Sequence, residues 1–372
     1  MRKIVIAGAG KIGATLADML GASGSYAVTV IDGSAAALDA LEAGTACGRR
    51  HVDVRDATAM ADVLSGAFAV LSAVPYDMTV PVAEAATASG VHYLDLTEDV
   101  AATRRVKALA PQARSALIPQ CGLAPGFISI VANGLASSFE RLDSVRLRVG
   151  ALPRYPSNAL NYNLTWSVDG VINEYCEPCE AVVEGQLRET PPLEGLEEFA
   201  LDGVTYEAFN TSGGLGTLAE TWAGKVRTLN YKTIRYPGHC AVMKALLEDL
   251  RFRHKRGLLK SVLQDAVPST LQDVVVIFAT VCGERGGRLE QETFAARIHG
   301  GAVGGHARSA IQVTTAAGIA AVLDLLAEGA IRGQGLVRQE EIALDRFLAN
   351  RFGRVYAAGA SGQAPGLLPT AA

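Results

Sequence analysis

The stretch Lys3-Ile4-Val5-Ile6-Ala7-Gly8-Ala9-Gly10-Lys11-Ile12-Gly13 is an apolar run that meets three closely spaced glycines. The run predicts a buried strand, and the Ala- and Leu-rich segment after Gly13 predicts a helix. In such a turn Gly8 permits a tight reversal, Gly10 lets a ligand approach the backbone, and Gly13 allows close packing of the helix against the strand. The pattern therefore predicts a βαβ unit with an anion-binding helix N-terminus.

An acidic residue, Asp32, closes the second expected strand, and a carboxylate there can accept hydrogen bonds from ribose hydroxyls. The residues after it, 33–37, contain no Arg or Lys for a 2′-phosphate, which Asp32 would also repel. We therefore expect a dinucleotide, NAD rather than NADP; a plain βαβ turn without a ligand is the alternative. The expected cofactor contacts are Gly8, Gly10, Lys11, Ile12, Gly13, Asp32, Asp53, Val54, Ala73, Val74, Cys121 and Gly122.

Two of these contact regions have a second interpretation. The segment 51–56 reads as a third strand running into a loop, where Asp53 and Val54 could flank the adenine, but it could equally be a solvated strand end. The segment 121–127 has the Gly and Pro content of a domain-crossing turn, whose backbone could bond the carboxamide of the cofactor. A simple linker is the competing interpretation.

Composition describes a globular chain with a small-molecule ligand. Its 372 residues favour two domains, and 49% hydrophobic with 19% charged residues supply a packed core. The net charge of −4 gives no reason to expect a nucleic acid or a membrane as partner. Six scattered cysteines suit a reduced, cytoplasmic protein. The apolar segment 310–326 carries polar residues and is expected to be a buried helix.

The pattern of strands and helices predicts an α/β protein. Residues 1–122 alternate short apolar strands with helices, which is typical of a doubly wound parallel sheet, a Rossmann domain. From about residue 142 alternating strands such as 144–149 and the hairpin 274–298 predict antiparallel sheet, in an α+β domain over 123–308 for substrate binding and dimerisation. The helical segments 309–328 and 340–352 are expected to return to the first domain, with a weakly ordered tail over 357–372.

Several polar clusters are candidates for chemistry. Tyr76 and Asp95 follow strands of the first domain and could orient substrate or handle a proton, although each could be structural. The segment 161–167, with Asn163, suits a polar pocket or a solvated strand. The remaining dense clusters are 213–218, with Thr217, and 232–239.

The segment 232–239 gathers three basic side chains. Arg235 offers a planar fork for a carboxylate, Lys232 a compact charge, and His239 a proton carrier or a helix cap. The pair Cys176 and Cys179 has no second pair of ligands at a suitable spacing, so we expect no metal.

Longer blocks extend these motifs. The GAGKIG turn, VPYD at 74–77, YLDLTED at 93–99, QCGLAPGF at 120–127, LNYNLTWS at 160–167, GTL at 216–218 and KTIRYPGH at 232–239 resemble the saccharopine dehydrogenase superfamily. Within it the chain is most similar to bacterial lysine 6-dehydrogenases, which oxidise the ε-amine of lysine with NAD. The resemblance implies a Rossmann domain, a second domain that completes the active site and often mediates dimers, and positions for Tyr76, Asp95 and Cys121 near substrate or nicotinamide.

The expected reaction is NAD-dependent oxidative deamination of L-lysine at its ε-amine, giving 2-aminoadipate 6-semialdehyde, which can cyclise, and ammonia. We expect Arg235 and Lys232 to hold the carboxylate and Asp95 or His239 to take the proton. Catalytic candidates are Asp95, His239 and Tyr76; substrate-binding candidates are Tyr76, Asp95, Asn163, Thr217, Lys232, Arg235 and His239. A homodimer or larger homo-oligomer is expected. The alternatives are saccharopine dehydrogenase itself and a non-catalytic NAD-binding sensor.

Overall fold

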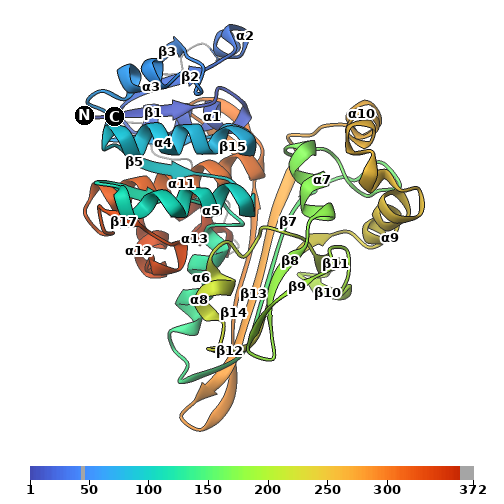
Figure 1. Ribbon diagram of the computed structural model, residues 1–372. Coiled ribbons are helices and arrows are strands. Elements are labelled where there is room, and N and C mark those ends of the chain that lie inside the picture. Colours follow the sequence, from blue (N-terminus) through green and yellow to red (C-terminus); the bar gives the residue numbers. More distant parts are fainter. Residues whose placement is uncertain (43–46, 361–372) are drawn as a thin grey trace.

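The first domain is built on a seven-stranded parallel sheet. The computed structural model describes residues 1–42 and 47–360, and Figure 1 shows the two sheets of the chain side by side. The strand order is β17-β6-β5-β4-β1-β2-β3, and every pairing in it is parallel. Its strands are β1 (Arg2–Ala7), β2 (Tyr26–Asp32), β3 (Gly48–His51), β4 (Ala69–Ser72), β5 (His92–Asp95), β6 (Ala116–Ile118) and β17 (Gly335–Leu336).

Helices cover both faces of this sheet, which explains the continuous apolar strands of the sequence. Along β1, Ile4 and Ile6 pack on the side of α1, whereas Val5 and Ala7 pack on the side of α3 to α5. The fold class predicted from the alternation of strands and helices is confirmed. The helices of this region are α1 (Lys11–Ala22), α2 (Ala35–Asp39), α3 (Ala57–Leu64), α4 (Thr79–Ser89), α5 (Val100–Leu109) and α6 (Phe127–Ala136), with 3₁₀ turns η1 (Tyr76–Met78) and η2 (Ala110–Gln112).

The second sheet is mixed rather than wholly antiparallel. Its order is β10-β11-β12-β7-β13-β14, with the β8-β9 hairpin attached to β12. The β12–β7 pairing is parallel, which corrects the expectation of a purely antiparallel sheet; the hairpin predicted over 274–298 is confirmed as β13 and β14. These strands are β7 (Arg141–Pro153), β8 (Cys179–Val183), β9 (Gln186–Thr190), β10 (Glu197–Leu201), β11 (Val204–Asn210), β12 (Val226–Arg235), β13 (Asp273–Arg285) and β14 (Arg288–His299).

The second domain also contains several short helices. Figure 1 places α7 and α10 beside each other at the end of the long strands. The elements are α7 (Val168–Cys176), α8 (Leu218–Trp222), α9 (His239–Lys244) continuing as a π-helical turn (Ala245–Asp249), the 3₁₀ turn η4 (Phe252–His254) and α10 (Arg256–Ala266), and a small ribbon of β15 (Gly301–Val303) and β16 (His306–Arg308) follows.

Helix α11 (Ala310–Ala327) joins the two sheets into one hydrophobic core. It packs against α1 of the first domain and against β13 of the second. Ser309 caps its N-terminus, where the Ser309 hydroxyl accepts from the Gln312 amide and the Gln312 side chain accepts from the Ser309 amide. By length and composition α11 could cross a membrane, yet 83% of it is buried inside the protein. The expected buried helix is confirmed.

The C-terminal region differs from its prediction. In place of one helix over 340–352 the chain forms a 3₁₀ turn (Gln339–Glu341) and α12 (Leu344–Ala349). Residues 357–360, predicted to be weakly ordered, lie in α13 (Arg354–Ala360), and 361–372 lie outside the described residues. Strand β17 pairs with β6, so this part of the chain contributes to the first sheet. The exact division near 122 and 309 stays a prediction.

Candidate functional site

A cavity of 1340 Å³ lies where the carboxyl ends of the parallel strands face the second domain. Loops after β1, β2, β4 and β5 line one side, and β7, β12, α7 and the segment 164–170 line the other. Ligands of open α/β sheets bind outside the carboxyl ends of the strands, because the loops there diverge. The volume suffices for a dinucleotide and a small substrate together.

The glycine turn has the geometry that its sequence predicted. Gly8 has a φ of +106°, and a Cβ on it would lie 2.6 Å from the carbonyl oxygen of Ala73. A Cβ on Gly13 would lie 1.9 Å from the carbonyl oxygen of Gly8, so helix and strand can pack only without it. Gly10 faces open space, which leaves its backbone accessible to a ligand. The turn therefore fits a pyrophosphate at the N-terminus of α1.

Asp32 ends β2 at the edge of the cavity. Its Oδ2 accepts a hydrogen bond from the Ala9 amide at 2.8 Å, and its Oδ1 accepts one from the Ser34 amide at 2.8 Å. These bonds fix the carboxylate beside the glycine turn. The position suits recognition of a ribose.

Arg55, a cation at the nucleotide end of the cavity, was not predicted from the sequence. Strand β3 ends at His51, so Asp53, Val54 and Arg55 form a loop that lines the cavity. Arg55 forms a bidentate ion pair with Asp53, in which Nε donates to Oδ1 at 3.0 Å and Nη2 donates to Oδ2 at 3.1 Å. Both side chains are largely exposed. Arg55 is the only guanidinium that lines the nucleotide end within the described chain, and it bears on the choice between NAD and NADP.

The other predicted cofactor contacts divide into two groups. Lys11, Ile12, Ala73, Val74 and Gly122 line the cavity. Gly13 lies behind the turn, and Cys121 is buried, with its Sγ 3.0 Å from the Ile118 carbonyl oxygen and 3.2 Å from the Gln339 amide nitrogen. The Cys121 side chain is thereby turned away from the cavity, whereas the expected contact through the backbone of this turn stays a prediction.

Tyr76 and Asp95 lie in different environments. Tyr76, in η1, is partly exposed and lines the cavity. Asp95 is 1% exposed and does not line the cavity. Its carboxylate accepts from the Tyr93 hydroxyl at 2.8 Å and from the amides of Thr97 and Gln120 at 3.0 and 2.8 Å.

These bonds define the role of Asp95. Burial raises the pKa of Asp95 to about 6, although its three hydrogen bonds oppose the shift. The carboxylate ties the loop after β5 to the start of the loop after β6. Asp95 therefore braces the loop that lines the cavity, and the expectation that it takes a substrate proton is corrected.

Arg235 is the fixed cation of the second domain. It lines the cavity and is only 2% exposed. Its Nε donates to the Tyr175 hydroxyl at 2.9 Å, and Nη1 donates to the Thr233 hydroxyl at 2.7 Å. Within the described chain Nη2 has no hydrogen-bond partner, and the Tyr162 ring lies 5.1 Å from the guanidinium carbon. The guanidinium is thus held rigidly with one edge available to a ligand.

His239 holds Tyr175, the hydrogen-bond partner of Arg235, in place. One ring nitrogen lies 3.0 Å from the Tyr175 hydroxyl and the other 2.8 Å from the Leu160 carbonyl oxygen. Burial, followed by the charge of Arg235, lowers the pKa of His239 to about 3. Both nitrogens are used and the ring does not line the cavity, so His239 is a positioning residue and not the expected proton carrier.

Lys232 faces away from the cavity. Tyr231, Thr233 and Arg235 alternate along β12 and line the cavity, so Lys232 lies on the opposite face of the sheet. There its Nζ lies 3.3 Å from a Glu197 carboxylate oxygen. This strand geometry corrects its expected role in substrate binding.

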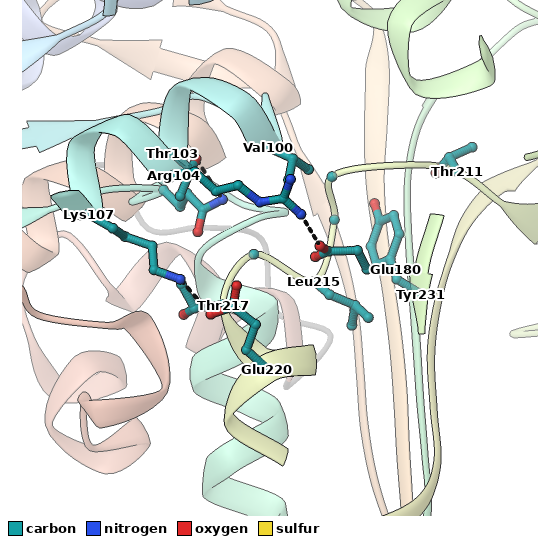
Figure 2. Close-up of a pocket in the computed structure, with 14 residues that line it drawn as sticks. Val100, Thr103, Arg104, Lys107, Glu180, Thr211, Leu215, Thr217, Glu220 and Tyr231 are labelled. Atoms are coloured by element: carbon teal, nitrogen blue, oxygen red, sulfur yellow. Dashed lines mark hydrogen bonds and ion pairs between the residues drawn. The ribbon is translucent and has the colours of Figure 1, made fainter. Parts of the chain in front are cut away.

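Thr217 also lies elsewhere, in a second pocket of about 20 Å³ (Figure 2). Ion pairs from α5 cross that pocket, Lys107 to Glu220 at 2.5 Å and Arg104 to Glu180 at 3.4 Å. A space of this size holds about one water molecule, and the Thr217 hydroxyl bonds to Glu340 at 2.9 Å. Thr217 is therefore not placed to bind a substrate.

The polar segment 161–167 lines the cavity, but through other residues than the predicted Asn163. Asn163 is buried and does not line the cavity, whereas Thr165 and Trp166 do. The Thr165 hydroxyl is buried and has no hydrogen-bond partner in residues 1–42 and 47–360. A buried hydroxyl without a partner is costly unless a ligand satisfies it.

Four acids that line the cavity were not predicted from the sequence, Asp77, Glu98, Asp169 and Glu174, and two of them lie deepest in the protein. Glu174 of α7 is 8% exposed, lines the cavity and makes no side-chain hydrogen bond or ion pair with any described residue. Burial raises the pKa of Glu174 to about 8; Arg235 lowers it and Glu98 raises it further. Glu98, on the loop after β5, lines the same cavity, and burial raises its pKa too.

The sequence contained a signal for each of the two deepest acids. Glu98 stands in the polar run that follows β5. Glu174 comes three residues after Val171, on the buried face of α7, and an acid on a buried helix face is unusual unless it has a function.

One other group of possible metal ligands lies outside the cavity. Asp18, Glu42 and His306 bring ligand atoms within 4.8 Å of one another. The Arg308 guanidinium contacts both carboxylates. Positive charge is therefore already supplied there, and we assign no metal to it.

Comparison with known proteins agrees with this architecture. Residues 4–118 match the model of the saccharopine dehydrogenase NADP binding domain, and residues 122–354 match that of the saccharopine dehydrogenase C-terminal domain. Saccharopine dehydrogenase (L-Glu forming) from Saccharomyces cerevisiae shares the fold, with a TM-score of 0.75 at 18% identity over 93% of this chain and 96% of that one.

Two further solved structures are more distant. A myo-inositol dehydrogenase from Corynebacterium glutamicum has a TM-score of 0.45 at 11% identity, over 98% of each chain. An engineered D-amino acid dehydrogenase bound to NADP+ has a TM-score of 0.47 at 12% identity, over 93% of this chain and 95% of that one. The family models together cover most of the sequence. The chain therefore belongs to the saccharopine dehydrogenase family of NAD(P)-binding oxidoreductases.

Proposed function

We propose that this enzyme oxidises the ε-amine of L-lysine with NAD, giving 2-aminoadipate 6-semialdehyde and ammonia. The observation that supports this most is the charge of the substrate end of the cavity. Of the described cavity residues, the cations are Lys11 and Arg55 at the nucleotide end and Arg235 in the second domain. This one cation shares the cavity with two acids that have no cationic partner in the described chain, the buried Glu174 and the half-buried Glu98. Two further acids, Asp77 and Asp169, also line the cavity, and Asp169 is paired with Lys260 at 2.7 Å.

This balance suits a ligand with one carboxylate and two amines. L-lysine has that composition, whereas saccharopine carries three carboxylates. Two of those would meet Glu98 and Glu174 without a matching cation, and an unpaired buried charge costs several kcal/mol, roughly 3–5. The charges of the cavity therefore favour L-lysine over saccharopine, which is the second candidate because the family carries its name.

The carboxylate of the substrate has a defined partner. The free edge of Arg235 can donate to a carboxylate oxygen, and the unpartnered Thr165 hydroxyl lies in the same wall. A charge-assisted hydrogen bond of this kind contributes about 1.5–3 kcal/mol. Tyr175 and His239 hold the guanidinium in place and so reduce the entropy that binding would cost.

The cofactor would be held by the turn at 8–13 and by Asp32. When bound, it supplies an acceptor for the hydride that leaves the amine-bearing carbon. We prefer NAD because Asp32 repels a 2′-phosphate. Arg55 is engaged by Asp53, which leaves it less able to attract that phosphate.

An absorbance assay for NADH with L-lysine, saccharopine and simple diamines tests the proposal. NADH formation from L-lysine is expected; formation from saccharopine alone would overturn it. Arg235→Ala should raise KM for L-lysine by about 10- to 150-fold and leave the Kd for NAD unchanged. Equal losses of both would contradict the role of Arg235.

A further inference from the structure

We propose that Glu98 and Glu174 divide the recognition of the two amines: Glu174 binds the α-ammonium group, and Glu98 binds the reacting amine and takes its proton. The inference deepens the proposed function and rests on it. Asp95 and His239 are excluded as bases because all their polar atoms are engaged away from the cavity. Of the three catalytic candidates from the sequence only Tyr76 lines the cavity, and a carboxylate, which is negatively charged and only accepts, suits an ammonium group better than a phenol does. We therefore look for the proton acceptor among the acids of the cavity.

The order of the three charged groups follows from contacts between the segments that carry them. Tyr175, next to Glu174 in α7, accepts a hydrogen bond from Arg235 Nε at 2.9 Å, and the Glu174 carbonyl oxygen accepts one from the Ser212 amide at 3.0 Å. The following residue, Gly213, lies against Glu98, because a Cβ on Gly213 would lie 3.1 Å from the Glu98 Cβ. Along the cavity the order is thus Arg235, Glu174 and Glu98.

This order matches an amino acid that carries a second amine on its side chain. Arg235 and Glu174 both line the cavity and form no ion pair with each other, so a ligand can lie between their opposite charges. A carboxylate and the α-ammonium beside it can fill that space, each meeting its counter-charge. The side chain then extends towards Glu98.

Glu98 lies at the end where the chemistry takes place. It belongs to the loop after β5, whose strand is joined through β4 to β1 and the glycine turn. Its neighbours Leu96 and Thr97 line the cavity together with Ala73 and Val74. An amine that reaches Glu98 is thus presented at the carboxyl ends of the parallel strands.

The proton and electron balance is simple. Glu98 accepts a proton from the ε-ammonium group and frees the nitrogen lone pair. That pair forms the C=N bond as the C–H bond breaks and its electrons leave with the hydrogen to the oxidised cofactor. Water adds to the resulting iminium, and the carbon–nitrogen bond breaks to release ammonia and the aldehyde. A general base of this kind contributes about 10²- to 10⁴-fold to the rate.

Truncated ligands separate the two roles. Binding to the protein saturated with NADH is measured by calorimetry for L-lysine, for 6-aminohexanoate, which lacks the α-amine, and for L-norleucine, which lacks the ε-amine. Glu174→Gln should weaken L-lysine by about 10- to 150-fold and leave 6-aminohexanoate unchanged. Glu98→Gln should weaken L-lysine similarly and leave L-norleucine unchanged. Glu189→Gln, an exposed acid of β9, is the control.

Kinetics test the proton acceptor. Glu98→Gln should lower kcat by about 10²- to 10⁴-fold. The rate of this variant should rise tenfold per pH unit, because the unprotonated amine must then form without a base. Glu98→Asp should retain part of the wild-type rate and of the wild-type pH profile. An unchanged pH profile in Glu98→Gln, or equal weakening of L-lysine and L-norleucine, would overturn the assignment. Failure of the wild type to oxidise L-lysine would instead refute the proposed function.

Discussion

Glu174→Gln should make the ligand-free protein more stable at alkaline pH. Burial raises the pKa of Glu174 from 4.5 to about 8 in the folded protein. Above 4.5 the unfolded chain releases this proton while the folded protein keeps it, so stability falls with rising pH until about 8 and then stays lower. At about 1.4 kcal/mol per pH unit, the difference of 3.5 (8 − 4.5) corresponds to at most about 5 kcal/mol. In Glu174→Gln the side-chain amide is uncharged at every pH, so this loss of stability does not occur.

Denaturant unfolding of the wild type, Glu174→Gln and the control Glu189→Gln measures this effect. Near pH 5 the three proteins should be almost equally stable. Near pH 9 Glu174→Gln should exceed the wild type by a few kcal/mol, up to about 5, and Glu189→Gln should follow the wild type. Saturating L-lysine should narrow the gap, because its α-ammonium neutralises Glu174. A difference that does not depend on pH, or a variant that is less stable at pH 9, would refute the reasoning.

Three further changes have defined outcomes. Gly13→Ala should cut NAD affinity at least about 10-fold by fluorescence titration, because its Cβ would lie 1.9 Å from the Gly8 oxygen; Gly257→Ala, with open space around it, should not. Asp32→Ser should raise the ratio of kcat/KM for NADP to that for NAD by about 10-fold or more; an unchanged ratio would contradict the role of Asp32. His239→Gln should raise KM for L-lysine about 10-fold with an unaltered pH profile, since a ring with a pKa near 3 does not titrate in the working range. Loss of a pH-rate limb would restore His239 as a base.

The first domain could be predicted because its signals are local. The run at 3–7 is apolar at every position, which indicates a strand covered on both faces, and the turn at 8–13 requires glycine for steric reasons that involve its immediate neighbours. Asp32 can also be recognised from its local sequence, because it is the acid that closes the next apolar strand. These features do not depend on how the second domain packs.

The second-domain site could be predicted only in part. Lys232 and Arg235 stand close together in the sequence, but the period of two along β12 places them on opposite faces, and that strand was not anticipated. Glu174 shares the cavity with Arg235 because its neighbour Tyr175 in α7 contacts Arg235 of β12. Proximity between residues separated by a helix and several strands leaves no local pattern, so the acids of the cavity became visible in the folded protein.

The central claim is that the ε-amine of L-lysine is the group removed. L-lysine labelled with ¹⁵N at the ε-position, incubated with the enzyme and NAD, tests it most directly, with the released ammonia analysed by mass spectrometry. We predict labelled ammonia in an amount equal to the NADH formed. Unlabelled ammonia, or NADH formed from saccharopine but not from L-lysine, would contradict the account.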